Sequence, residues 1–181
     1  MRFSTVLLFL FLPFMLSAKD RIPKSIYDFR VKDRFGKTID FSKFKGKKIL
    51  IVNTPAMATN APQYAELEAA CQKYKKSLVV VGFLIEDFSK PPRGKIDVTN
   101  LDKKDYKVTF PLTALAEVKG DGPDLNPVYK WLTHAKYNHF KNNDVQWDFQ
   151  KYLINEKGEL VAVFLSETSV NSPEVISAIE K

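Results

Sequence analysis

The stretch Lys47–Ile85, KKILIVNTPAMATNAPQYAELEAACQKYKKSLVVVGFLI, decides the fold of this chain. Its residues 47–53 form an almost unbroken run of β-branched and other apolar side chains, which is typical of a strand buried on both faces. A similar run at 77–85 predicts a second buried strand. Because a helical segment separates the two runs, the sequence predicts a right-handed strand–helix–strand unit with parallel strands.

The segment between the two strands carries the signals of a helix start. Asn60 is a suitable N-cap, Pro62 suits the first turn, and Gln63 stands at the capping-box position. Apolar positions then recur with the period of one helix face. These positions are Tyr64, Leu67, Cys71 and Tyr74.

Two further hairpins are predicted, one on each side of this unit. Residues 26–44 alternate apolar and polar side chains around DRFG, which predicts an N-terminal β-hairpin with Gly36 in its turn. Residues 147–165 predict a second antiparallel hairpin, which turns on NEKG at 155–158.

The remaining elements complete one domain. Residues 99–106 predict a short polar helix and 106–112 a short strand. Asn-Pro at 126–127 and Ser-Pro at 172–173 each predict a helix N-terminus. We expect a single α/β domain over residues 19–181, with a central mixed β-sheet and helices on both faces.

The first 18 residues, MRFSTVLLFLFLPFMLSA, predict a signal peptide rather than part of the fold. Arg2 supplies the positive charge, residues 6–16 the apolar run, and Ser17-Ala18 a small-residue cleavage site. The run is too short to span a bilayer, so we expect no stable membrane anchor after cleavage. The expected destination is the periplasm or the outside of the cell.

The composition bears on two questions: whether the protein binds nucleic acid and whether it forms disulfide bonds. The chain has 28 Lys and Arg against 21 Asp and Glu, and the lysines are scattered among acidic residues. Without a basic stripe or a groove-reading motif, a nucleic-acid partner is not expected. Cys71 is the only cysteine, so an internal disulfide is excluded and stability must come from packing.

Seven stretches together resemble the glutathione peroxidase family, which has a thioredoxin-like fold. They are SIYDF, GKTIDFSKFKGKKILIVN, PQYAELEAACQKYK, LVVVGF, VTFPL, NPVYKWL and WDFQKYLINEKGELV. They occur in family order and cover nearly all of residues 24–181. The resemblance implies a thioredoxin-like domain and, as its expected activity, hydroperoxide reduction in oxidative-stress defence.

The same resemblance assigns the positions where that chemistry should lie. The peroxide-reducing sulfur or selenium of the family corresponds to Ala58, counted from the Val-Asn stretch before it or the Pro-Gln-Tyr stretch after it. The family's glutamine corresponds to Asp87, and its tryptophan and asparagine correspond to Trp147 and Asp148. The stretch NLDKKDYKVTFP, where a resolving cysteine would precede VTFP, contains no cysteine.

These replacements predict the loss of thiol-peroxidase activity. A methyl group has no lone pair with which to attack an oxygen of a peroxide. Asp87 and Asp148 would place carboxylates where the family has neutral hydrogen-bonding groups, and negative charge opposes a thiolate. We therefore expect an exported, catalytically degenerate relative that acts as a binding or structural module. Its partner would be an unidentified protein or small molecule, and no cofactor is expected.

Two other functions remain open at this point. Cys71 could reduce hydroperoxides from a new position, although its place far along the predicted helix favours a core thiol. Glu86, Asp87 and Asp148 converge in the family fold and could hold a cation with oxygen ligands. Their spacing matches no calcium loop, which favours solvated carboxylates. For Trp147, a packing role and a functional role are equally compatible with the sequence.

Overall fold

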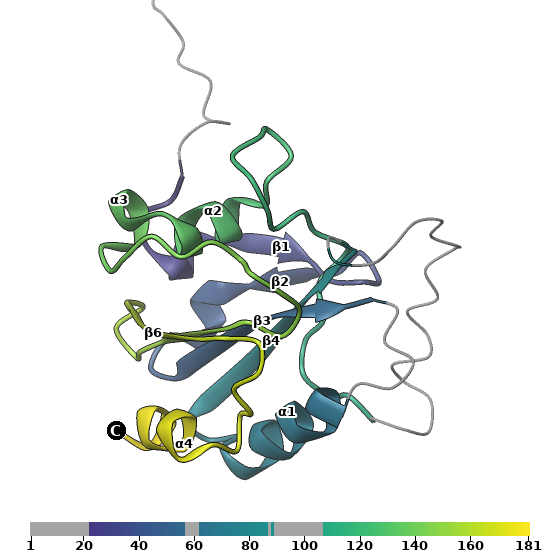
Figure 1. Ribbon diagram of the computed structural model, residues 1–181, viewed down its shortest axis with the longest axis vertical. Helices are drawn as coiled ribbons and strands as arrows, with labels where there is room; N and C mark the ends of the chain where they lie inside the picture. The colour runs from purple at the N-terminus through teal and green to yellow at the C-terminus, as the bar shows by residue number, and fades with distance from the viewer. Residues whose placement is uncertain (1–21, 57–61, 87, 89–106) are drawn as a thin grey trace, which may run out of the picture.

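The central element of the protein is a four-stranded mixed sheet with the order β4-β3-β5-β6 (Figure 1). The computed structural model describes residues 22–56, 62–86, 88 and 107–181. The strands are β3 (Lys48–Pro55), β4 (Leu78–Ile85), β5 (Lys151–Ile154) and β6 (Leu160–Phe164). β3 pairs with β4 in parallel and with β5 antiparallel, and β5 pairs antiparallel with β6.

The predicted strand–helix–strand unit is confirmed as β3, α1 (Pro62–Lys73) and β4. β3 is buried along its length up to Thr54, as expected for a strand with neighbours on both edges and helices on both faces. The predicted N-cap Asn60 lies outside the described residues.

Helices cover both faces of the sheet, as predicted (Figure 1). α1 and α4 (Pro173–Glu180) lie on one face, where they pack on β-strand side chains that include Leu50 and Val52. The other face carries α2 (Pro127–Thr133) and α3 (Ala135–Asn138), and its core includes Ile49 and Ile51. Alternate residues of β3 therefore fill two separate hydrophobic cores.

The predicted N-terminal hairpin is confirmed and lies on the α2 side of the sheet (Figure 1). It consists of β1 (Arg30–Lys32) and β2 (Thr38–Asp40), and Gly36 adopts φ +84° in the turn. Short 3-10 helices, η2 (Ile26–Asp28) and η3 (Phe41–Phe44), flank it. Their buried residues Ile26, Tyr27 and Phe41 join the core of that face.

The prediction of a strand over 106–112 is wrong for its described part, residues 107–112. This segment runs beside β4 with a single bridge, between Gly82 and Leu112. Pro111 lacks an N–H and cannot donate to a ladder, although its carbonyl oxygen accepts from Gly82 at 2.9 Å. A Cβ on Gly82 would lie 2.5 Å from Leu112 Cδ2, so glycine permits the close approach.

The two predicted helix starts after residue 120 are both present, but they differ in capping. Asn126 Oδ1 accepts from Val128 N at 2.9 Å at the start of α2. Ser172 precedes α4 without a side-chain capping bond, and its buried Oγ has no hydrogen-bond partner among the described residues. The predicted helix at 99–106 lies outside the described residues. In the described part of the chain, no helix has the length and apolar character of a membrane span.

Candidate functional site

The site assigned by the resemblance lies where β3 leads into α1. Ala58 and Asp87 themselves fall outside the described residues. A hydrogen bond joins the two elements on either side of position 58: Tyr64 OH of α1 donates to Pro55 O of β3 at 2.9 Å. Ala56 N donates to Ile85 O at 3.1 Å, which joins the end of β3 to the end of β4.

Trp147 forms an exposed aromatic surface beside this corner. Its side chain is 58% exposed, and its ring centroid lies 5.1 Å from that of Phe88. Lys119 Nζ lies 3.7 Å from the Phe88 centroid, within the range of a cation–π contact. Trp147 is therefore not a core residue. Sequence reasoning missed Phe88 and Lys119, which lie 59 and 28 positions before Trp147.

The backbone around Trp147 is anchored to the buried strand β3. Asn53 Nδ2 donates to Trp147 O at 2.8 Å, and Phe149 N donates to Asn53 O at 2.7 Å. Phe149 adopts a left-handed φ of +60°, which bends the chain as it enters β5. The side-chain oxygen of Asn53, Oδ1, is buried and has no hydrogen-bond partner among the described residues.

Asp148 is half-buried next to Trp147. Burial raises the pKa of its carboxyl group, and the positive charge of Lys119 offsets this only in part. Ser166 Oγ donates to Asp148 O, so the backbone here is also joined to the segment that follows β6. Burial that disfavours the charged form of Asp148 would also disfavour a thiolate in the same surroundings.

Lys151 is a fully buried amine that sequence reasoning also missed. Its Nζ donates to Gln63 Oε1 at 2.8 Å, to Phe149 O at 2.7 Å and to Ser166 O at 3.4 Å. Burial lowers the pKa of Lys151 to about 8, although Glu66 and Glu167 favour the charged form. A lysine at an inward-facing position of a strongly apolar strand was the signal that could have found it.

These residues surround an open depression of about 430 Å³. Its walls come from the first turn of α1, the segment before β5 and the segment after β6: Gln63, Trp147, Asp148, Phe149, Ser166 and Glu167. An exposed indole beside backbone and side-chain hydrogen-bonding groups can bind a ligand with a planar or apolar part. None of the described residues that line it contains sulfur.

Two other predicted site residues that the structure describes, Cys71 and Glu86, do not line this depression. Cys71, near the end of α1, is partly buried against the α1–α4 core, and burial together with Glu68 raises the pKa of its thiol. Glu86 follows β4 directly and is partly buried. Within the described ranges, no three His, Cys, Asp or Glu side chains are grouped as metal ligands.

Comparisons with known proteins identify relatives of the whole domain. The sequence model of the family described as "Glutathione peroxidase" matches residues 26–133. Glutathione peroxidase-like peroxiredoxin gpx1 of Schizosaccharomyces pombe is 35% identical over 150 residues, which cover 82% of this chain and 91% of that protein. Glutathione peroxidase-like peroxiredoxin 2 of Saccharomyces cerevisiae is 34% identical over 161 residues, covering 87% and 98%.

Solved structures show the same likeness in three dimensions. The apo form of Trgpx superposes with a TM-score of 0.64 at 33% identity and covers 87% of this chain and 96% of that one. T. cruzi GPX1 gives a TM-score of 0.63 at 26% identity, with 86% and 93% covered. The expected thioredoxin-like fold is thereby confirmed.

Proposed function

Since this chain belongs to the glutathione peroxidase family, we propose that it retains the family fold as an exported binding module and has lost thiol-dependent peroxide reduction. The single observation that carries the proposal is the absence of a thiol at the position of the family's nucleophile. Position 58 holds alanine, and the only cysteine of the chain is at position 71.

The setting of Cys71 supports the loss of activity. A peroxide is attacked by a thiolate, and a raised pKa reduces the fraction of thiolate at neutral pH. The thiol also lies close to the end of α1, far from the helix N-terminus that would stabilise a negative charge. Cys71 is therefore a poor substitute for a nucleophile at position 58.

The exposed face around Trp147 supports a binding role. Exposed apolar side chains that lie together mark binding surfaces more often than single ones do, and the Trp147 ring lies against that of Phe88 next to an open depression. We propose that the ligand contacts Trp147 with a planar or apolar group and places polar atoms near Gln63 and Ser166. The leader sequence MRFSTVLLFLFLPFMLSA supports export of the module to the periplasm or the medium.

A coupled assay of peroxide consumption tests the loss of activity. Metal-free protein is mixed with hydrogen peroxide or a lipid hydroperoxide and with a thiol reductant, and the expected rate equals that of buffer. The names of the relatives, which are peroxiredoxins and glutathione peroxidases, favour the alternative that peroxide is still reduced. Turnover that disappears in Cys71→Ser would establish that alternative and refute our proposal.

A cation-binding function through Glu86, Asp87 and Asp148 is tested separately. Calorimetric titration with calcium, magnesium and manganese would show heat and a raised melting temperature if these carboxylates formed a site. We expect neither, because the spacing of these carboxylates matches no calcium loop and the described residues contain no group of three metal-ligating side chains.

A further inference from the structure

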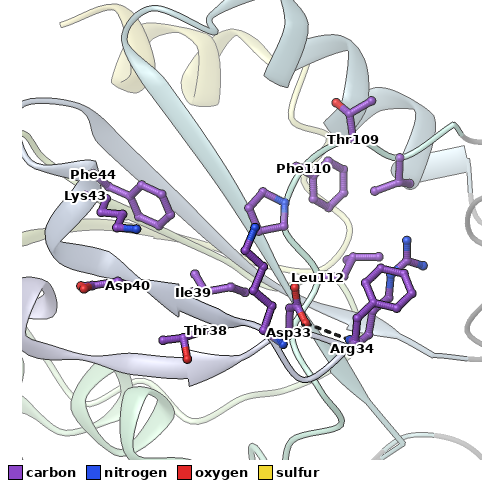
Figure 2. A pocket seen from close by; sticks show the side chains of 14 residues that line it. Asp33, Arg34, Thr38, Ile39, Asp40, Lys43, Phe44, Thr109, Phe110 and Leu112 are labelled. Atoms are coloured by element: carbon purple, nitrogen blue, oxygen red, sulfur yellow. Dashed lines mark hydrogen bonds between the residues drawn. The ribbon is translucent and has the colours of Figure 1, made fainter.

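A second concave surface lies away from the Trp147 depression, beside the N-terminal hairpin (Figure 2). We call it the hairpin groove. It has a volume of about 390 Å³ and is bordered by the β1–β2 turn, by η3 and by the segment 108–112. Neither the resemblance nor the proposed function assigns it a role.

The inner part of the hairpin groove is apolar. Ile39, Phe110 and Leu112 are buried side chains of its walls, and Phe44 is partly buried. Figure 2 shows Phe44 and Phe110 reaching toward the groove from different elements. At its rim the ring of Phe35 is 72% exposed. Such a surface favours a ligand with an apolar ring or chain.

The acidic groups of the groove are already engaged by the protein. Asp33 Oδ1 accepts from Phe35 N and from Lys37 N, each at 2.8 Å. Asp40 forms an ion pair with Arg30 at 3.2 Å and accepts from Ser42 Oγ at 2.7 Å. Both carboxylates are thus used in local turns and pairs.

Two basic groups of the groove, those of Lys37 and Lys43, are less engaged. Within the part of the chain that the structure describes, the ammonium groups of Lys37 and Lys43 have no hydrogen-bond or salt-bridge partner, and both side chains are exposed. The hydrogen bonds of Ser42 and, to a smaller extent, the charges of Arg30 and Lys43 lower the pKa of Asp40. The Arg34 guanidinium adds a third positive charge, 4.6 Å from the Phe35 centroid. The groove therefore has an excess of positive charge over an apolar interior, which favours an anion.

Hydrogen bonds hold the walls of the groove in place. Arg34 N donates to Leu112 O at 3.1 Å, which joins the hairpin turn to the opposite wall. That wall is fixed to α1, because Thr109 N and Oγ1 each donate to a carboxylate oxygen of Glu68 at 2.7 Å. A preformed groove loses little conformational entropy when a ligand binds.

We propose that the hairpin groove binds a small aromatic anion. The ring of the ligand packs against Phe44 and Phe110, and its carboxylate or sulfonate pairs with Lys37 and Lys43. The proposal is independent of the function assigned to the Trp147 depression, since the two surfaces share no residue.

Fluorescence titration with 8-anilinonaphthalene-1-sulfonate tests the proposal, with N-phenyl-1-naphthylamine as the probe that lacks the sulfonate. We expect the wild-type protein to bind the sulfonate with saturation. The double variant Lys37→Gln/Lys43→Gln should weaken that binding by about fivefold, as two solvent-exposed charge pairs are lost. Affinity for the uncharged probe should stay the same.

Matched variants separate this groove from other surfaces. Phe44→Ala should weaken both probes, whereas Lys157→Gln, an exposed lysine elsewhere, should weaken neither. Unchanged melting temperatures of the lysine variants show that they fold. Unchanged sulfonate binding by the double lysine variant would overturn the proposal. A loss of binding in Trp147→Ala alone would also overturn it, because the probe would then occupy the other depression.

Discussion

Replacing Lys151 by methionine is expected to change how the stability of the protein depends on pH above 8. The folded-state pKa of this buried amine is about 8, against 10.5 for an ordinary lysine. Between these values the unfolded chain binds more protons than the folded protein, so the free energy of unfolding rises as the pH rises. Below pH 8 the folded protein carries the full cost of burying the charge.

The size of the effect follows from the difference between the two pKa values. Each unit corresponds to about 1.4 kcal/mol, so the wild-type protein should gain about 3 kcal/mol from Lys151 between pH 8 and pH 10.5. The methionine variant cannot gain it. The variant also loses the bonds to Gln63, Phe149 and Ser166, which lowers its stability throughout this pH range.

Urea unfolding at a series of pH values from 7.5 to 10.5, followed by circular dichroism, measures the effect. The difference in unfolding free energy between wild type and Lys151→Met should widen with pH by about 3 kcal/mol. Lys157→Met, at an exposed position, should show a constant difference. A difference for Lys151→Met that stays constant within about 0.5 kcal/mol would refute the reasoning.

Three further changes have defined outcomes. Ala58→Cys should react slowly with iodoacetamide, and adding Asp148→Asn should raise the rate by up to about tenfold, since a carboxylate that opposes the thiolate is gone; equal rates would contradict this. Burial opposes ionisation of Glu68, but its hydrogen bonds prevail and lower its pKa. Glu68→Gln should therefore cost about 1 kcal/mol at pH 7 in urea unfolding, and the cost should shrink as the pH falls through the lowered pKa; a pH-independent cost would argue against it. Gly82→Ala should lower stability by about 1–3 kcal/mol through overpacking, whereas Gly122→Ala, with open space around it, should melt like wild type; equal melting of both would exclude the clash.

The parts of the fold that could be predicted are those with local signals. The apolar runs of β3 and β4 and the alternation in the hairpins depend on neighbouring residues alone, and all four elements are present. The segment 107–112 could not be predicted, because its path depends on contact with Gly82 from a distant part of the chain.

In the candidate site, too, features with a local sequence signal could be predicted, and features that depend on distant contacts could not. Trp147 and Asp148 could be located by the resemblance, since both lie in a stretch with a matching pattern. The pairing of Phe88 with Trp147 and the bonds of Lys151 join segments that are far apart in sequence. Side-chain orientation and burial decide such contacts, and neither is encoded in a short motif.

The hydrogen bonds that stabilise the segments around position 58 have an evolutionary consequence. They are made by Asn53, Tyr64 and Lys151. Each of the three supports the rim through contacts that do not involve a reactive atom. If the nucleophile has been exchanged for alanine, as we propose, this framework would survive the exchange, and natural selection could then adapt the surface for recognition. Under that proposal scaffold and chemistry are separable, so loss of one does not force decay of the other.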